Sequence, residues 1–451
     1  MKISRLIPVL TVLGLVLTAC SGVPGASSEA PEDAGPVSKD VANAGDVTLE
    51  VWDFHNTGGE NKWAERLNRE FTDKYPNVTI DRHSQSFTDL MATLNLKVSS
   101  EDPPDVVAAN QGWQSMGTLS EAGLLLPLDK YAEAYGWQDL YPESLLKQHM
   151  FTRDGNEMGK GTLFGMPNAF TSIVGAFYNR TKLQDLGLKL PETFEEFERV
   201  LQIAKDEGEI PIQLGALEQW PITTPFFATL NTMASQDYIN NLVYGQGDVS
   251  FDSSETIRAA STLQEWAQNG YFAPGYNGVS VTDADQRFAE GEGLFIISGT
   301  GSSATYADGL GSDLGFSLLP AQGGQAPIAT GSSQSDFSIP SGSDTPDVAA
   351  AYIDFFASQH AAEVAAEISL LPLLKVEGAQ ASSDSVYTDM LEAQQLLFEN
   401  DAYVPYLDWA TPTFLDTLGK AAQSLASGRL TPDQFVSTGQ SDYAKFRAKK
   451  E

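Results

Sequence analysis

The stretch Val47 to Trp52 (VTLEVW) decides the fold class, together with the polar loop Asp53 to Gly59 (DFHNTGG) behind it. Its β-branched and apolar residues predict a buried strand. Lys62 to Tyr75 follows with large apolar residues four positions apart, which predicts an amphipathic helix that Pro76 ends. A strand, a polar loop and a helix in this order indicate an α/β protein.

The same alternation continues along the chain. Val78 to Ile80 is a second predicted strand, Asp89 to Ser99 a helix, and Asp105 to Ala109 a third strand. Strands that alternate with helices predict a parallel sheet covered by helices on both faces. Ligands of such sheets bind beyond the carboxyl ends of the strands. The loops after the first and third strands are therefore the first candidates for a binding site.

Further strands and helices fill the rest of the chain. The predicted strands are Ile173 to Asn179, Leu294 to Ile297, Phe316 to Pro320 and Phe337 to Pro340. A helix begins near Phe194, another spans Asp283 to Gly291, and helices predominate from Asp347 onward. The 451 residues suffice for two cores of ordinary size, so two lobes are expected.

Composition and charge exclude several classes of function. The formal net charge is −33, which argues against nucleic acid or an anionic membrane face as the main partner. Cys20 is the one cysteine, so the chain has neither an intramolecular disulfide nor a cysteine-based metal cluster. We expect a protein without cofactor or metal.

The N-terminus has the pattern of an export signal. Lys2 and Arg5 precede the apolar run Leu6 to Leu17, which is too short to span a bilayer, so residues 1–19 are predicted to be a signal peptide. The sequence around Cys20 resembles the bacterial lipobox, in which this cysteine carries lipid. Ser21 to Gly45 lacks aromatic residues, Leu and Ile, so residues 20–45 are predicted to form the lipidated cysteine and a flexible tether.

A succession of short motifs carries a family resemblance. The motifs are Val47–Phe54, Asp102–Val106, Gly123–Asp129, Gly165–Pro167, Phe177–Arg180, Pro191–Phe194, Phe288–Gly293, Asp347–Ala357 and Gly428–Pro432. Their order over nearly the whole mature chain resembles the extracellular solute-binding proteins of ABC importers. The most similar branch binds sugars and oligosaccharides and includes maltose-binding protein.

The resemblance implies a two-lobed, hinged α/β fold in which each lobe is a mainly parallel sheet flanked by helices. Three crossings would join the lobes, near residues 170–173, 316–320 and 357–361. The N-lobe would comprise 46–170 plus 320–358, and the C-lobe 171–319 plus 359–451. The implied function is capture of a carbohydrate by a monomer held at the extracellular face of the cell membrane by its lipid, and delivery to the permease subunits of an importer.

Sugar recognition needs flat apolar side chains and fixed hydrogen-bonding groups, which makes loop tryptophans the first candidates. Trp113, Trp220 and Trp409 lie in loops that also carry Asp, Asn, Gln or Pro, although each could equally cap the edge of a core. Trp63 and Trp266 lie in amphipathic helices and are assigned to the core; Trp137 is assigned to a surface corner, and Trp52 is left open. The family often has a Trp after the strand Leu294–Ile297 and another near Phe337; this chain has neither.

The polar candidates follow the same loops. They are Asp53, His55 and Asn56 after the first strand, Asn110 and Gln111 after the third, Gln334 and Asp336 before a later strand, and Asp408 beside Trp409. The family pattern adds Asn168 and Phe170, just before the first crossing.

Two alternatives stay open at this stage. A secreted glycoside hydrolase needs only two carboxylates, and 60 acidic residues always permit a pair. A lipoprotein for a peptide or a metal is the other alternative. The four histidines lack metal-site spacing, and Asp248 and Asp252 lack the spacing of a calcium loop, so neither set predicts a metal centre.

Overall fold

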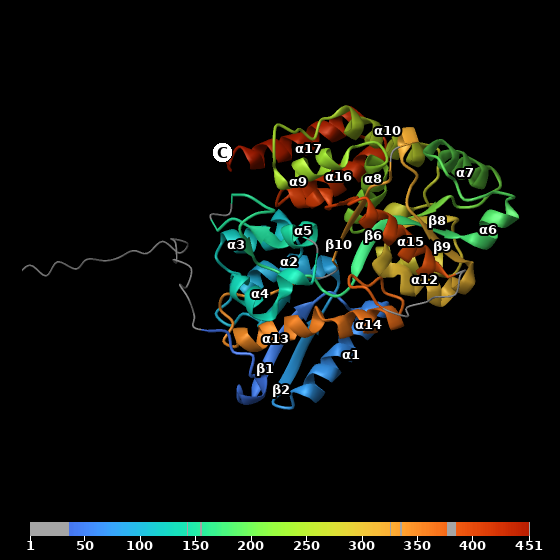
Figure 1. Cartoon of the computed structure of the whole chain (residues 1–451). Coiled ribbons are helices and arrows are strands. Elements are labelled where there is room, and N and C mark those ends of the chain that lie inside the picture. Colours follow the sequence, from blue (N-terminus) through green and yellow to red (C-terminus); the bar gives the residue numbers. More distant parts are fainter. Residues whose placement is uncertain are drawn as a thin grey trace, which may run out of the picture. The chain divides into compact units, whose positions relative to one another are not determined.

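The computed structural model describes residues 36–141, 143–153, 156–324, 326–333, 336–376 and 385–450 (Figure 1). The chain divides into two units, Met1–Pro36 and Val37–Glu451, and the folded elements belong to the second. The predicted signal peptide, Cys20, most of the predicted tether and Gln334 lie outside the described residues.

The first sheet has the predicted parallel core. Its strand order is β11-β3-β1-β2, with bounds β1 (Val47–Asp53), β2 (Val78–Ser84), β3 (Val106–Ala108) and β11 (Phe337–Ser338). β1 pairs parallel with β2 and β3, and β11 joins β3 antiparallel from far along the chain. The carboxyl ends of β1 and β3 therefore lie at one edge of this sheet, as the sequence predicted.

The second sheet is built around β6 (Thr171–Asn179). Its order is β12-β10-β6-β8-β7, with β9 also paired to β6; the bounds are β7 (Ile212–Gln213), β8 (Phe295–Gly299), β9 (Leu314–Ser317), β10 (Ala329–Ser333) and β12 (Tyr403–Val404). β6 runs antiparallel to β8, β9 and β10. The prediction of a mainly parallel sheet is thus right for the first sheet and wrong for the second. All nine residues of β6 are buried. A fully buried strand has the same apolar composition in a parallel and in an antiparallel sheet, so its sequence does not reveal the direction of its neighbours.

Helices surround both sheets. They are α1 (Gly58–Lys74), α2 (Phe87–Val98), α3 (Thr118–Glu121), α4 (Asp129–Tyr135), α5 (Glu143–Leu146), α6 (Arg180–Asp185), α7 (Phe194–Asp206), α8 (Thr223–Asn231), α9 (Gln236–Tyr244), α10 (Ser254–Gln268), α11 (Val281–Ala289), α12 (Ser303–Leu310), α13 (Pro346–Phe356), α14 (Gln359–Glu367), α15 (Val386–Glu399), α16 (Phe414–Ala426) and α17 (Pro432–Arg447). A small hairpin of β4 (Met150–Phe151) and β5 (Thr162–Leu163) stands apart. In Figure 1, α1 and α13 lie with β1 and β2, whereas α12 and α15 lie with β8 and β9.

We call the elements around the first sheet the first lobe and those around the second sheet the second lobe. β10 pairs with β6, so strand 329–333 belongs to the second sheet although it falls in the predicted N-lobe segment. α14 meets α1 through the Trp63 indole, which donates to the Ala361 carbonyl at 2.9 Å, although it falls in the predicted C-lobe segment. The lobe boundaries stay a prediction, and these contacts favour shifting two of them by about ten residues.

The local predictions differ from the structure mainly at the ends of elements. β2 continues to Ser84, four residues beyond the predicted strand, because its later residues alternate between the two faces of an edge strand. α1 begins at Gly58, inside the predicted polar loop, so that Gly58 and Gly59 form its first turn. Helix ends carry weaker signals than helix middles, and both shifts matter for the site.

Tryptophan burial tests the assignments to core and surface. Trp63 and Trp266 are buried at 0% and 1% exposure, which confirms their assignment to the core. The prediction for Trp137 is wrong, because its ring is fully buried, stacks on Tyr135 and donates its indole N–H to Asp354 at 2.9 Å. A glycine turn next to a tryptophan looks like a surface corner in the sequence, but α13 covers it in the fold.

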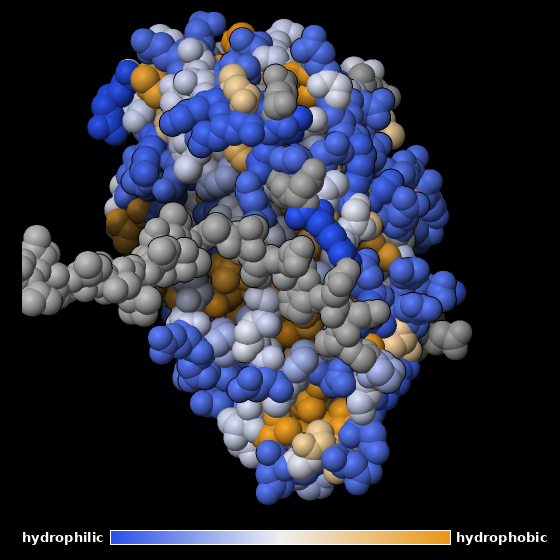
Figure 2. Space-filling model, turned by 90° about the vertical axis from the view of Figure 1, so that its left-hand side faces the viewer, coloured by the Kyte–Doolittle hydropathy of each residue, from blue (hydrophilic) through white to orange (hydrophobic). Residues whose placement is uncertain are grey.

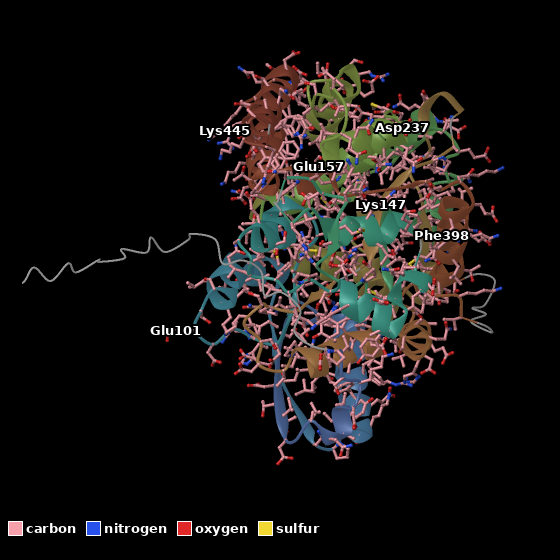
Figure 3. All side chains as sticks on the ribbon, turned by 60° about the vertical axis from the view of Figure 1, so that its left-hand side comes forward. Glu101, Lys147, Glu157, Asp237, Phe398 and Lys445 are labelled. Atoms are coloured by element: carbon pink, nitrogen blue, oxygen red, sulfur yellow. The ribbon has the colours of Figure 1, made fainter. Side chains whose placement is uncertain are left out.

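The surface is mainly hydrophilic. Figure 2 shows one face on which polar residues predominate and apolar residues appear in separate patches. Glu101, Asp237 and Lys445 lie on the outside of the molecule (Figure 3). Among the described helices, none combines the length and the apolar character needed to cross a membrane.

Candidate functional site

The loop after β1 is held in place by a buried ion pair. Arg82 of β2 donates to both carboxylate oxygens of Asp53, at 2.6 and 2.9 Å, and also to the His55 carbonyl at 2.6 Å. The Ser84 hydroxyl and the His55 backbone N–H donate to the same carboxylate, at 2.7 and 3.0 Å. These four donors leave Asp53 little capacity to receive a ligand, so we assign it to shaping the loop.

His55 presents a polar atom that lacks a partner. Its ring is fully buried, and Nδ1 lies 3.1 Å from the Glu60 carboxylate in the first turn of α1. Nε2 has no hydrogen-bond partner among the described residues. A buried ring nitrogen left without a partner costs free energy, which a ligand hydroxyl at this position would recover.

A continuous row of rings runs from the hinge side of the first lobe to the second lobe. Phe170, just before β6, contacts His55 at 5.7 Å between ring centroids. His55 adjoins Phe54 at 5.6 Å, and Phe54 meets Phe87 edge-on at 5.3 Å. Phe87, at the start of α2, meets Trp220 of the second lobe at 6.0 Å. The row gives an apolar face to one side of the boundary between the lobes.

The loop after β3 contacts the second lobe directly. Gln111 is buried and donates from Nε2 to the Ser333 carbonyl at the end of β10, at 3.2 Å. Gly112 lies so near Trp409 that a Cβ on the glycine would stand 2.3 Å from the Trp409 Cβ. Glycine's φ of +81° is also one that other residues avoid. Two of the predicted loops thus meet, one from each lobe.

Asp408 is a buried carboxyl that forms no ion pair with another of the described residues. It is 5% exposed, and burial raises its pKa to about 7, opposed only by a hydrogen bond from its own backbone N–H. The neighbouring Tyr406 has its pKa raised to about 12 by burial, with Ser172 bonding to it and the charges of Asp408 and Glu60 nearby. Polar groups of β6, α1 and the 407–410 turn therefore converge where the lobes meet.

Two roles were predicted for Trp113: stacking on a sugar, or capping the edge of a core. In this conformation its ring packs in the core. It is 1% exposed and lies edge-on between Phe151 at 5.2 Å and Phe446 of α17 at 5.1 Å. The Lys450 ammonium lies 4.4 Å from the centre of its ring. This indole is therefore buried by the protein, whereas Trp220 is only half-buried.

Asp336 belongs to a buried polar cluster between the end of β10 and the start of β11. The His149 Nε2 lies 2.7 Å from its carboxylate, and the Ser333 hydroxyl donates to it as well. His149 Nδ1 faces the Leu145 carbonyl at 2.9 Å, so the carboxylate and the serine stand at the same ring nitrogen. A Ser-His-Asp catalytic triad needs them at opposite nitrogens. The cluster therefore lacks the geometry of a catalytic triad, and we assign it a structural role.

Other predicted residues lie apart from these contacts. Asn56 is exposed, and Asn110 is half-buried, with its carbonyl accepting the Met116 N–H at 3.0 Å. Asn168 is buried at the first crossing, next to Phe170, and its carbonyl accepts the Tyr141 hydroxyl at 3.4 Å. No group of three or more potential ligands for a metal occurs among the described residues.

Sequence reasoning missed several residues at the boundary between the lobes: Glu60, Arg82, Phe87, Gly112 and Tyr406. Phe87 was within reach, because it stands just past the carboxyl end of a parallel strand. The sequence pattern predicts that the strand ends at Ile80, which places Phe87 several residues beyond the predicted strand end. Arg82 and Tyr406 carried no local signal, because their partners lie in other segments of the chain.

Comparisons with known proteins place this geometry in a family. The model of the family "Bacterial extracellular solute-binding protein" matches residues 56–363, which include Phe87, Phe170 and Trp220 of the row of rings and the strands β6 and β10. The chain belongs to this family. The family's description is of an extracellular solute-binding protein, which is the class that the order of motifs predicted.

Two relatives of this solute-binding protein share part of its sequence. The multiple sugar-binding protein of Streptococcus mutans is 23% identical over 306 residues, or 66% of each chain. An uncharacterised ABC transporter extracellular-binding protein of Pyrococcus horikoshii is 22% identical over 240 residues, or 52% of this chain and 50% of that one. The solute-binding protein thus matches about half of the length of one relative and two thirds of the other.

Solved structures agree in fold over nearly the whole chain. A chitin oligosaccharide binding protein has a TM-score of 0.78 at 20% identity and covers 89% of this chain and 99% of its own. A solute-binding protein in complex with raffinose has a TM-score of 0.70 at 18% identity, over 89% and 100%. These similarities confirm the predicted periplasmic-binding-protein-like fold of the solute-binding protein.

Proposed function

We propose that this solute-binding protein captures a carbohydrate, in the form of an oligosaccharide, outside the cell and delivers it to the permease subunits of an ABC importer. The row of rings that ends in the contact between Phe87 and Trp220 carries the proposal. Relatives named for sugar binding, and a structural neighbour with raffinose bound, support the same class of ligand.

The two kinds of group at the boundary between the lobes suit the two kinds of surface on a sugar. The C–H faces of a pyranose pack on aromatic rings, as Phe54, Phe87 and Trp220 provide. Its hydroxyls need acceptors and donors that are fixed and poorly solvated. Asp408, His55 Nε2 and the Trp220 Nε1, which also has no hydrogen-bond partner in the described part of the chain, supply them.

The proposed mechanism is a population shift between open and closed arrangements of the lobes. A ligand that contacts both lobes binds the closed arrangement better, and so increases its population. The permease subunits then recognise the closed form. The solute-binding protein works as a monomer in this scheme, because both halves of the site come from one chain.

A thermal-shift screen over mono- and oligosaccharides tests the proposal. A ligand present at 100 times its dissociation constant stabilises the folded state by about 2.7 kcal/mol, so the correct sugar should raise the melting temperature by several degrees. Peptides and divalent cations at matched concentrations serve as controls. Stabilisation by one of these controls, and by none of the carbohydrates, would contradict the proposal.

A glycoside hydrolase is the second candidate, and one observation favours it. A carboxyl with a pKa near 7, like that of Asp408, is what a general acid in glycoside hydrolysis requires. Incubating the purified protein with the sugar identified in the screen separates the two functions. Saturable binding of a sugar that stays intact supports a binding protein. Hydrolysis products would show instead that the protein is a glycoside hydrolase.

We further propose that the mature protein begins at Cys20 and is held to the membrane by lipid on this residue. The support is the sequence alone: an apolar run, a single cysteine directly behind it, and the segment Ser21 to Pro36, which lacks aromatic residues, Leu and Ile. The predicted tether is wrong at its end, because residues 37–45 belong to the folded unit, with Val41 2% exposed and its carbonyl accepting from Asn77 at 2.8 Å. A flexible chain from Ser21 to Pro36 would reach roughly 20–25 Å, enough for the folded unit to approach a permease.

Substituting Cys20→Ala in cells that express the full chain tests the anchor. We expect the protein to leave the membrane fraction, because one signal segment without acyl chains gives no stable anchoring. Metabolic labelling with a fatty acid should mark the wild-type chain and not the variant. A variant that remains in the membrane fraction, or a wild-type chain without label, would disprove lipidation at this position.

A further inference from the structure

The segment behind α17 crosses from the second lobe to the first. α17 itself packs in the second lobe, where Phe435 meets Phe226 of α8 edge-on at 4.9 Å between ring centroids. Beyond the helix, the Lys450 side chain reaches α3 of the first lobe, and its ammonium lies 3.0 Å from the Glu121 carboxylate. In Figure 1 the C-terminal end of α17 extends toward the side of the molecule on which α3 lies. Lys450 therefore joins the two lobes.

Trp113 and Glu121 form the seat of Lys450 on the first lobe. The Lys450 ammonium lies 4.4 Å from the centre of the Trp113 ring. Phe151 holds that ring at 5.2 Å, and Gly117 lies so near that a Cβ on the glycine would stand 2.8 Å from the indole. The face of an indole attracts a cation, and more strongly where water is excluded. Because the Lys450 side chain is 6% exposed, this attraction acts with little water around the ammonium.

The second lobe holds the backbone of Lys450 in place. The Lys450 N–H donates to the Arg447 carbonyl at 2.9 Å, which continues the last turn of α17. The Arg447 guanidinium donates to the carbonyl of Gly245, directly after α9, at 2.6 Å. A Cβ on Gly245 would collide with that guanidinium, so the contact requires a glycine. The ammonium of Lys450 therefore moves with the second lobe, whereas its two partners move with the first.

Separation of the lobes would break these contacts together. Trp113 is 1% exposed while Lys450 and Phe446, whose ring lies 5.1 Å away, cover it. When α17 withdraws with the second lobe, the ammonium loses the indole face and the carboxylate, and the indole becomes exposed to water. Interactions that exist in one arrangement only increase the population of that arrangement. The rings from Phe170 to Trp220 take no part in them.

We propose that Lys450 is a latch between the lobes, a positioning residue that keeps part of the population closed before any ligand binds. For a ligand that binds only the closed arrangement, the apparent Kd is the intrinsic Kd divided by the closed fraction. A larger closed fraction strengthens the binding of every such ligand by the same factor. The latch therefore sets affinity without selecting among ligands. The inference goes beyond the proposed function, because it holds for any solute that the lobes enclose.

Fluorine NMR of the unliganded protein, labelled with fluorotryptophan, tests the latch. Trp113→Phe assigns the Trp113 signal, whose covered and uncovered states report the closed and the open arrangement. Lys450→Met keeps the apolar stem and removes the charge, so the ratio of open to closed should rise about 10-fold. Glu121→Gln should raise the same ratio by less, about 3-fold, because that carboxylate is 50% exposed.

Three further variants distinguish a latch from a general effect of charge. Lys450→Arg keeps a cation that stacks on an indole, so its ratio should stay within about 2-fold of the wild-type value. Lys445→Met removes the same charge from an exposed position of α17 on the outside of the molecule and should leave the ratio unchanged (Figure 3). Lys450→Met combined with Glu121→Gln should give less than the product of the single effects, because both act on one contact. Melting temperatures verify that each variant is folded.

A rise in the ratio for Lys450→Met that Lys450→Arg does not show would support the latch. An unchanged ratio in a folded Lys450→Met variant would overturn it, and so would an equal rise in Lys445→Met. All of these measurements are made without ligand. Failure of every carbohydrate in the thermal-shift screen would therefore overturn the proposed function and leave the latch in place.

Discussion

Asp408→Asn should make the protein more stable at pH 8 by up to about 4 kcal/mol and leave its stability at pH 4 nearly unchanged. Burial raises the pKa of Asp408 from 3.8 to about 7, and three pKa units correspond to about 4 kcal/mol. Asparagine has nearly the same shape and does not ionise. The variant therefore removes the cost of a buried charge without creating a cavity.

The direction of the pH dependence follows from linkage. Well below the unfolded pKa of 3.8 the carboxyl is protonated in both the folded and the unfolded chain, so it contributes no difference; at pH 4 the difference is about 0.5 kcal/mol. Between about pH 4 and 7 the unfolded chain releases the proton and the folded chain retains it, so wild-type stability falls as the pH rises. Above the folded pKa the difference stays constant.

Denaturant unfolding of both proteins at pH 4 to 8 measures this difference curve. Asp416→Asn is the control, because that side chain is 73% exposed on α16, so the substitution removes no buried charge. Other titrating groups affect both proteins and cancel. A flat curve for Asp408→Asn would mean that this carboxyl is solvated in solution and not buried at the boundary between the lobes.

Gly112→Ala should weaken ligand binding by at least about 100-fold, or 2.7 kcal/mol. The added Cβ would stand 2.3 Å from the Trp409 Cβ and 2.6 Å from its Cα, and the backbone of the 407–410 turn cannot yield that far without losing its packing. The lobes should therefore stay apart even with ligand present. Small-angle scattering should show a radius of gyration that saturating ligand no longer reduces.

Gly136→Ala is the matched control for this substitution. Gly136 also has a positive φ, +74°, but a Cβ there would meet no atom within 4 Å. It should cost about 1–2 kcal/mol of stability through backbone strain and leave affinity unchanged. If Gly112→Ala lowers stability in the same way and still binds ligand with wild-type affinity, the contact between Gly112 and Trp409 is not part of closure.

The fold was predictable from the sequence where one signal dominates. β1 buries every second residue in a run of β-branched and apolar residues, and α1 repeats apolar residues every fourth position, so both elements were predicted, although α1 begins four residues earlier than expected. The direction of β6 was not predictable, because a fully buried strand has the same composition whether its neighbours are parallel or antiparallel. The end of β2 was missed because an edge strand carries polar residues that resemble a loop.

For the candidate site, the sequence pointed to loops that the fold brings to the boundary between the lobes, but not to the roles of the residues within them. Five candidates follow strands or lie in polar turns: His55, Gln111, Trp220, Asp408 and Trp409. Contacts at the boundary between the lobes involve all of them except Asp408, which lies next to Trp409 in the sequence. Asp53 and Trp113 were chosen on the same grounds. The Asp53 carboxylate is bound by Arg82, and the Trp113 ring packs between Phe151 and Phe446.

The sequence by itself determined the α/β class, the two lobes and the family, because these rest on periodicity and on the order of motifs along the chain. Tertiary structure alone decided which polar groups are satisfied by the protein and which remain for a ligand. The partner of Asp53, Arg82, lies 29 residues away in the chain, and the partner of Phe87, Trp220, lies in the other lobe. Hydrogen bonds and ring contacts of this kind form between segments whose proximity no local pattern encodes.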